Sequence, residues 1–190
     1  MSLEFTGKDV LLDEIDQAVQ ADSVHAITDD LRARLCRLIG DARVRLPECV
    51  FEHSQDHYKR RLLHQDTRLG YSVMAMTWAP GQGTPVHDHD GMWCVEAVWQ
   101  GVIEVQQYEL VEQTADRFRL ERRTVMRTGT GSAGSLIPPH EYHTIANPDL
   151  EHAAVTLHIY AGAMNQCCAF QPLGEDWYLR EPRVLSLDAA

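Results

Sequence analysis

From Tyr71 onward the sequence is a succession of short apolar or alternating segments separated by turn residues. Segments of this length and spacing are typical of an all-β barrel or sandwich. Glycines stand between several of them, where the chain must turn. The segments are YSVMAMTW, CVEAVWQG, VIEVQQYEL, FRLERRTVM, SLIP, HTIAN, AAVTLHIY and CCAFQPL. The chain is therefore expected to fold mainly as β-structure.

The first third of the chain has helical spacing instead. Apolar residues recur at intervals of three and four, from Val10 to Val19 and again from Leu31 to Ile39. Thr28 with Asp29 is expected to cap the second helix, and Gly40 to end it. No low-complexity linker divides the chain. Residues 1–190 are therefore predicted to form one domain, with helices in 1–45 packed on a β-barrel in 46–190.

The net charge excludes several kinds of partner. A formal charge of −11 over 190 residues repels nucleic acid and anionic membranes, so we expect a small-molecule partner, without nucleic acid or membrane. The N-terminus is acidic where a signal peptide is basic. The five cysteines lack C-x-x-C spacing, which favours reduced thiols in a cytoplasmic protein. A monomer or small homo-oligomer is expected.

Two histidines one residue apart, in PVHDHDGMW, indicate a metal site. Residues i and i+2 of a strand lie on the same face, so the His87 and His89 side chains are expected to point to a common position. A surface histidine pair is the ordinary alternative. The surrounding residues favour the metal site.

Those surroundings resemble the first motif of the cupin family. Five residues separate Gly81 from His87, and Gly101 stands where the motif has its last glycine. Cys94 occupies the position of the motif's glutamate. The resemblance implies an all-β cupin barrel, a small jelly-roll, carrying the helices as an N-terminal segment. It also implies a metal site without a carboxylate.

The third ligand comes from PPHEYHTIAN, which resembles the second cupin motif. Pro138, His143 and Asn147 match that motif, and His140 stands where it has a glycine. His143 is the expected ligand because its spacing to Asn147 completes the motif. His140 is the rival.

A more specific resemblance begins at AVTLHIY. Thr156, His158 and Tyr160 alternate along it and so share one face of a strand. The stretch resembles the serine-x-histidine-x-tyrosine segment of the thiol dioxygenases, and within them of cysteine dioxygenase of the bacterial type. In that family this histidine lies fifteen residues beyond the third iron ligand, as His158 lies beyond His143.

A second segment supports the same resemblance. YKRRLLHQD is similar to the family's tyrosine-x-arginine segment through Tyr58 and Arg60. The matched part of the chain runs from about Tyr58 to Phe170.

The resemblance implies an enzyme that uses Fe(2+) and O2 to oxidise L-cysteine to its sulfinic acid. The metal would be held by His87, His89 and His143. Arg60 would hold the substrate carboxylate, because guanidinium donors match its two oxygens.

Four further roles come from the resemblance. Tyr58 and the Tyr160 hydroxyl would orient the carboxylate and the oxygen, and His158 would position Tyr160 by hydrogen bonding. Thr156 replaces the family's serine and keeps its hydroxyl. Cys94 stands where the animal enzymes have a cysteine joined to the tyrosine by a thioether bond. A small buried hydrophobe is the alternative role for Cys94.

One departure from the animal enzymes and two differences from a related branch bear on the substrate. AGAM follows Tyr160 where the animal enzymes have serine-proline-proline. The 3-mercaptopropionate enzymes of the family have a glutamine in place of Arg60 and an arginine after the strand, whereas NQCCAF has none. The presence of Arg60 and the absence of an arginine in NQCCAF both favour an amino-acid thiol. 3-Mercaptopropionate, mercaptosuccinate and a metal-binding cupin without thiol chemistry are the alternatives.

Overall fold

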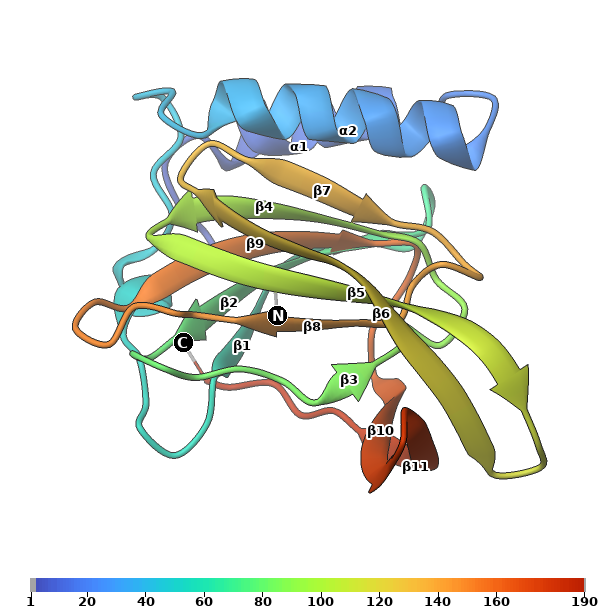
Figure 1. Ribbon diagram of the computed structural model, residues 1–190. Coiled ribbons are helices and arrows are strands. Elements are labelled where there is room, and N and C mark those ends of the chain that lie inside the picture. Colours follow the sequence, from blue (N-terminus) through green and yellow to red (C-terminus); the bar gives the residue numbers. More distant parts are fainter. Residues whose placement is uncertain (1–2, 190) are drawn as a thin grey trace.

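The computed structural model describes residues 3–189, and its regular elements begin with two helices. Helix α1 spans Lys8–Ala18, α2 spans Val24–Leu38, and a short 3-10 helix follows at Glu48–Phe51. The strands come after these helices (Figure 1). They are β1 Lys59–Asp66, β2 Tyr71–Trp78, β3 Val86–His87, β4 Cys94–Gln100, β5 Val102–Gln113, β6 Arg117–Gly129, β7 Ala133–Leu136, β8 His143–Ala146, β9 Ala154–Tyr160, β10 Gln166–Gly174 and β11 Trp177–Val184.

The strands form two antiparallel layers that share an interior. One sheet has the order β1-β2-β9-β4-β7, and the other strands close into a ring in the order β10-β11-β6-β5-β8-β3. Side chains from both layers meet in one buried cluster, for example Met76 of β2 with Ile103 of β5 and Ile145 of β8. Figure 1 shows the helices across the outer face of the first sheet. The predicted fold class, an all-β cupin barrel with an N-terminal helical segment, is confirmed.

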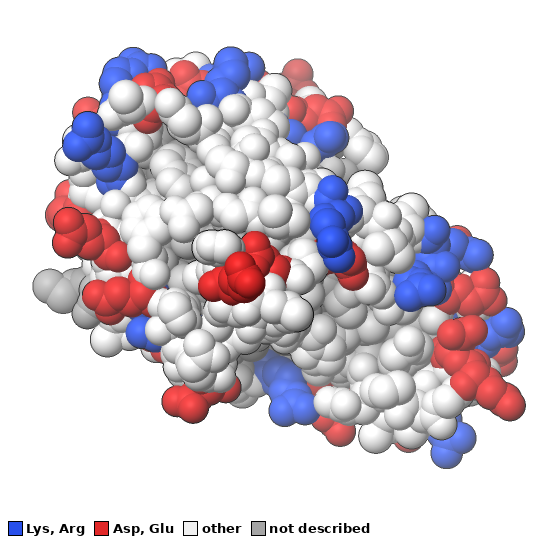
Figure 2. All heavy atoms as spheres, turned by 60° about the vertical axis from the view of Figure 1, so that its left-hand side comes forward, with Lys and Arg blue, Asp and Glu red and all other residues white. Residues whose placement is uncertain are grey.

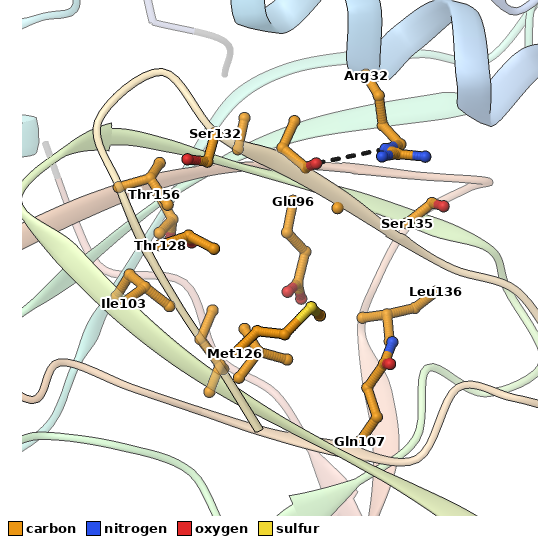
Figure 3. Close-up of a pocket in the computed structure, with 16 residues that line it drawn as sticks. Arg32, Glu96, Ile103, Gln107, Met126, Thr128, Ser132, Ser135, Leu136 and Thr156 are labelled. Carbon is orange, nitrogen blue, oxygen red and sulfur yellow. Dashed lines mark hydrogen bonds between the residues drawn. The ribbon is translucent and has the colours of Figure 1, made fainter. Parts of the chain in front are cut away.

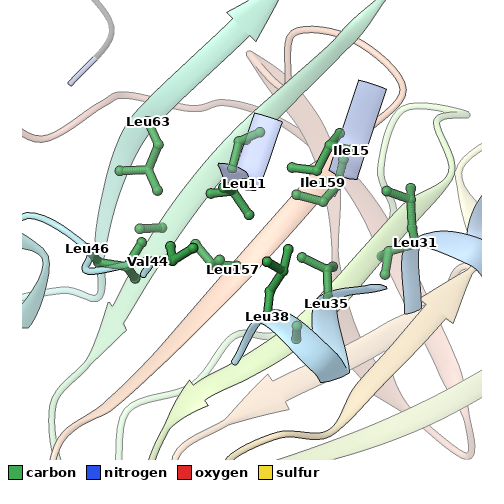
Figure 4. Packing of buried hydrophobic residues seen from close by; sticks show 14 of the residues in the cluster. Leu11, Ile15, Leu31, Leu35, Leu38, Val44, Leu46, Leu63, Leu157 and Ile159 are labelled. Carbon is green, nitrogen blue, oxygen red and sulfur yellow. The ribbon is translucent and has the colours of Figure 1, made fainter. Parts of the chain in front are cut away.

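The middle strands of the first sheet are buried on both faces. Every residue of β9 is buried, and successive side chains of a strand alternate between its two sides. Leu157 and Ile159 therefore pack against the helices, as Figure 4 shows. Thr156, His158 and Tyr160 take the other side and face the barrel interior. The helices thus cover the sheet, and polar chemistry is directed inward.

Both helices contact the sheet through a narrow apolar stripe. Leu11 and Ile15 of α1, and Leu31 and Leu35 of α2, are spaced by four residues and are fully or almost fully buried (Figure 4). Residues spaced by four lie on one helix face. Truncating one of these leucines to alanine costs about 2–5 kcal/mol in comparable cores.

The start of α2 differs from the predicted one. Ser23 has extended backbone geometry, and its hydroxyl accepts a hydrogen bond from the Ala26 N–H at 3.2 Å. Thr28 already lies inside the helix, where its hydroxyl donates to the His25 carbonyl. The serine satisfies a free N–H group of the first turn, so the helix begins earlier. Gly40, with φ of 95°, follows the end of α2 as predicted.

Strands β1, β3 and β11 were not among the predicted segments. β1 contains the basic run in which Arg60 and Arg61 lie, a composition typical of a solvated face. Both arginines are instead buried, with exposed fractions of 5% and 1%. The Arg61 guanidinium donates to Thr77 Oγ1 and to the Glu52 carbonyl, so its polar atoms find partners within the protein.

The surface carries charges of both signs. Figure 2 shows acidic and basic side chains intermingled on the visible face and most frequent at its two ends. On the β5–β6 hairpin, Arg123 contacts both Glu109 and Glu121. Neither helix of the described part of the chain is long and apolar enough to cross a membrane.

Candidate metal centre

Three histidines meet inside the barrel. His87 ends β3, His143 begins β8, and the two are paired across these strands. His89 lies just beyond β3 and has an exposed fraction of 0%. One ring nitrogen of each histidine lies within 4.8 Å of those of the other two. The structure thus brings together the three residues that the motifs indicated.

A turn, and not a continuous strand, orients His89. β3 stops at His87, and the intervening Asp88 accepts hydrogen bonds through Oδ1 from the backbone N–H groups of Cys168 and Asp90. These bonds fix the loop that carries His89 against β10. The His87 and His89 side chains converge as expected. Only His87 of this pair lies in a strand, however, and His89 is carried by the loop that follows it.

Backbone carbonyls fix the orientation of two rings. His143 Nδ1 lies 2.9 Å from the Glu141 carbonyl, and His87 Nδ1 lies 3.2 Å from the Pro85 carbonyl. A carbonyl only accepts, so we assign the ring hydrogen to Nδ1 in both. The Nε2 lone pairs are then free to bind a metal ion.

Burial keeps the imidazoles of His87 and His89 neutral. Burial, together with the neighbouring His143, lowers the pKa of His87 to about 3. Burial, together with the neighbouring His143 and His87, lowers the pKa of His89 well below its ordinary value. Neutral imidazole is the form that ligates metals.

The site contains buried polar atoms without hydrogen-bond partners. They include both ring nitrogens of His89, His143 Nε2 and Glu96 Oε1. Orphaned polar atoms are rare in native interiors, and a bound ion is one of their ordinary explanations. The donor set therefore fits a transition-metal ion such as iron(II) or zinc.

Glu96 was not among the predicted site residues. It lies on β4 two residues beyond Cys94 and directly opposite His158 of β9. Its Oε1 is 3.2 Å from His143 Nε2 and 3.2 Å from His158 Nδ1. Burial raises the pKa of Glu96, and the two imidazoles lower it more, so that it lies well below its ordinary value.

The structure therefore places a carboxylate beside His143, one of the three clustered histidines. In the cupin motif the glutamate stands at the position of Cys94. In this chain the carboxylate is that of Glu96, two residues later and on the same face of the strand. Reading β4 with that period of two would have identified Glu96.

Arg60 faces the same interior space as the metal-site histidines. A cavity of about 490 Å³ is lined by Tyr58, Arg60, His87, His158 and Tyr160, among other residues. The Arg60 guanidinium donates to the Ser186 and Met164 carbonyls, each at 2.9 Å. The ion pairs found within residues 3–189 do not include Arg60. Its positive charge is therefore available to an anion in the cavity.

A chain of hydrogen bonds holds His158 and Tyr160. The Trp78 indole donates to Thr156 Oγ1 at 2.9 Å, and that oxygen lies 2.7 Å from His158 Nε2. His158 Nδ1 lies 3.3 Å from the Tyr160 hydroxyl. Trp78 also stacks on Tyr58, with ring centroids 4.7 Å apart. The residues that the motif aligned on one strand are thus held in fixed positions at the cavity.

Cys94 and His140 have different environments. Cys94 is fully buried opposite Tyr160 in the β4–β9 register, and burial raises the pKa of its thiol well above the ordinary value. His140 is exposed and lies outside the histidine cluster. The geometry favours His143 over its rival.

A second cavity lies on the other side of Glu96. It has a volume of about 260 Å³ and shares Glu96 and Ile145 with the cavity that Arg60 and His87 line. Figure 3 shows the Glu96 carboxylate directed into this space toward Met126. Near its rim, Arg32 of α2 donates to the Ala133 carbonyl of β7. Glu96 is therefore accessible from two hollows of the barrel.

Comparison with known proteins agrees with this geometry. A family model described as cysteine dioxygenase type I matches residues 49–172. Cysteine dioxygenase type 1 of Rattus norvegicus is 23% identical over 117 residues, which is 61% of this chain and 56% of that protein. The human protein of the same name is 23% identical over 116 residues, with the same coverage. The chain thus matches little more than half the length of these curated relatives.

Solved structures resemble the chain more loosely. A conserved protein of Klebsiella pneumoniae with a double-stranded β-helix domain has a TM-score of 0.48 and 15% identity, covering 64% of this chain and 85% of that one. The cupin domain of Schizosaccharomyces pombe Cnp3 has a TM-score of 0.46 and 18% identity, covering 63% and 74%.

Proposed function

The chain belongs to the cysteine dioxygenase type I family, and from this premise we propose that it is an iron(II)-dependent thiol dioxygenase that converts L-cysteine and O2 to cysteine sulfinic acid. One observation carries the proposal: Arg60 and the metal-site residue His87 line the same cavity. A substrate held by its carboxylate at the arginine can direct its sulfur toward the histidine cluster.

The residues of the chain have distinct parts in this reaction. The metal would be held by His87, His89 and His143, and iron(II) in that site supplies the redox chemistry that lets a thiol react with dioxygen. The reaction adds both oxygen atoms of O2 to the sulfur, so that RSH and O2 give RSO2H without another reductant. Arg60 binds the carboxylate, and its remaining donors to carbonyls keep the guanidinium fixed.

Tyr160 and its neighbours orient the reactants. Its hydroxyl lines the cavity together with Tyr58 and can donate to a carboxylate or oxygen atom there. His158 holds the Tyr160 hydroxyl, and Thr156 holds His158. Burial raises the pKa of Tyr160 well above its ordinary value, so the phenol keeps its proton and remains a donor.

A cytoplasmic location is part of the proposal. The five cysteines are free, as expected for a reducing compartment. The partners would be a small-molecule thiol and O2.

A second substrate is favoured by a specific observation. Arg183 of β11 lines the same cavity as Arg60. Two guanidinium groups on one cavity suit a thiol with two carboxylates, such as mercaptosuccinate, because each carboxylate can accept paired hydrogen bonds.

Oxygen uptake by the iron-loaded protein tests these assignments. L-Cysteine, mercaptosuccinate and 3-mercaptopropionate are compared at equal concentrations, with sulfinic acid products identified by mass. Highest kcat/KM with cysteine supports the proposal, and highest kcat/KM with mercaptosuccinate selects the second substrate. Absence of uptake with all three thiols, in protein that retains iron, contradicts the proposal and leaves a metal-binding cupin without thiol chemistry.

A further inference from the structure

The second cavity of the barrel has no role in the proposed reaction as described so far. Its lining combines apolar side chains, among them Val105, Met126 and Ile145, with several serines and threonines. The charged residues that line it are Glu96 at its base and Arg32 at its rim (Figure 3). It is thus a hollow of mixed lining with one apolar wall.

That apolar wall is a row of side chains across three strands. Val105 of β5 stands opposite Met126 of β6 and opposite Ile145 of β8. Opposed residues of antiparallel strands carry their side chains on the same face of the sheet, and all three line the cavity. Met126 is 45% exposed, whereas Ile145 is 2% exposed. The apolar row therefore leads from the protein surface into the barrel.

The inner end of the apolar row lies beside the histidine cluster. Ile145 follows His143 by two residues of β8, so both side chains lie on one face. Gln107, which also lines the second cavity, stands opposite His143 in the β5–β8 pairing. Ile145 and Glu96 line the first cavity as well, the one that contains Arg60. The two cavities therefore adjoin next to His143.

The charges of the two cavities suit different reactants. Glu96 borders both of them. In the first cavity the Arg60 guanidinium, bonded to backbone carbonyls, attracts a carboxylated thiol. In the second, Arg32 is already paired with Asp29 at 3.4 Å, so Glu96 repels a carboxylate there. An uncharged reactant meets no such repulsion.

Dioxygen is the uncharged reactant of the proposed reaction. It is small and apolar, and transfer of an apolar molecule from water to an apolar wall is favourable. The thiol occupies the first cavity at the time when dioxygen must arrive. On the basis of the proposed function, we propose that the second cavity delivers dioxygen to the histidine cluster along the row Met126, Val105 and Ile145.

Xenon tests the gas-binding character of the cavity without any catalysis. Xenon binds in apolar cavities, and anomalous diffraction from xenon-pressurised crystals of the full-length protein locates it. We expect xenon beside Val105 and Ile145, and we expect Val105→Phe to remove it. Val125→Phe is the matched control, because Val125 is 51% exposed on β6 and lines neither cavity. No xenon at this position in the wild type would overturn the proposal.

Oxygen kinetics of the iron-loaded enzyme test delivery itself. At a saturating concentration of the preferred thiol, kcat/KM for O2 measures capture of dioxygen by the thiol-bound enzyme. We expect Val105→Phe to lower this value at least about three-fold, with the KM for the thiol unchanged. Val125→Phe should keep both values. If Val105→Phe does not fold, Met126→Trp at the exposed end of the row replaces it, with the same expected result.

A wild-type kcat/KM for O2 in the folded cavity variant would overturn the proposal. A fall confined to kcat/KM for the thiol would also overturn it, because the second cavity would then admit the thiol. These outcomes differ from failure of the proposed function, in which the wild type itself takes up no O2 with any of the three thiols and dioxygen delivery fails with it.

Discussion

Cys94 and Tyr160 stand directly opposite each other on β4 and β9, and both side chains are buried. Opposed residues of an antiparallel pair have Cβ atoms about 4.5–5.5 Å apart. A sulfur on one side and a phenol ring on the other are then close enough to be joined. The register thus supports a thioether bond between them as a prediction, without showing that the bond forms.

We expect the protein, after turnover with iron and O2, to contain a Cys94–Tyr160 thioether. Its formation removes two hydrogen atoms, so the intact mass after full reduction should fall by that amount. Cys94→Ser is the matched control and should keep the mass of its sequence. An unchanged wild-type mass after prolonged turnover would leave Cys94 as a small buried side chain.

Arg60→Gln should raise the KM for cysteine about ten-fold or more, because a charged hydrogen-bonding pair contributes about 1.5–3 kcal/mol. The value of kcat should change less. Arg61→Gln is the control. Arg61 is the next residue of β1, and its guanidinium donates to Thr77 Oγ1 and to the Glu52 carbonyl. That variant should lose stability while keeping KM. Equal KM values for Arg60→Gln and the wild type would place Arg60 outside the substrate site.

His143→Ala should abolish tight metal binding, whereas His140→Ala should not affect it. Of these two histidines, His143 is the one whose ring nitrogen lies within 4.8 Å of ring nitrogens of both His87 and His89. Metal at 100 times its dissociation constant should stabilise the wild type and the His140 variant by about 3 kcal/mol. Thermal unfolding with and without the metal measures this. If the metal no longer stabilised the His140→Ala variant, His140 would be the third ligand.

The sequence predicted the parts of the fold that are encoded locally. Period-two patterns and turn glycines located β2, β4 and β9 because alternation and turns depend on neighbouring residues. β1 was missed because its arginines suggested a solvated face. Their burial depends on partners far along the chain: Arg60 donates to carbonyls 104 and 126 residues away.

The site shows the same division. The H-x-H spacing and the second motif indicated His87, His89 and His143, whose approach to each other the structure shows. Glu96 was missed because a motif position directed attention to Cys94. Its proximity to His143 arises from the packing of β4 in one sheet against β8 in the other, and no local pattern encodes that packing.

Asp188 attaches the C-terminal segment to β1. Its carboxylate accepts from the Arg60 backbone N–H at 2.9 Å and contacts His57 Nε2 at 2.8 Å. Burial raises the pKa of Asp188, but these two contacts lower it more, so the folded-state pKa lies below the ordinary value. A lowered pKa stabilises the fold above the unfolded-state value near 3.9, and this stabilisation disappears as the pH falls through the folded-state pKa.

Asp188→Asn should therefore lower the free energy of unfolding by about 1–2 kcal/mol near pH 6 and by progressively less below about pH 4. Urea unfolding of both proteins across this range measures the difference. Asp13→Asn, at an exposed position of α1, is the control and should show almost no difference at either pH. Because the Ser186 carbonyl holds the Arg60 guanidinium, loosening the segment should also raise the KM for a carboxylated thiol. A stability difference for Asp188→Asn that is the same at pH values near 3 and 6 would mean that its charge does not hold the segment in place.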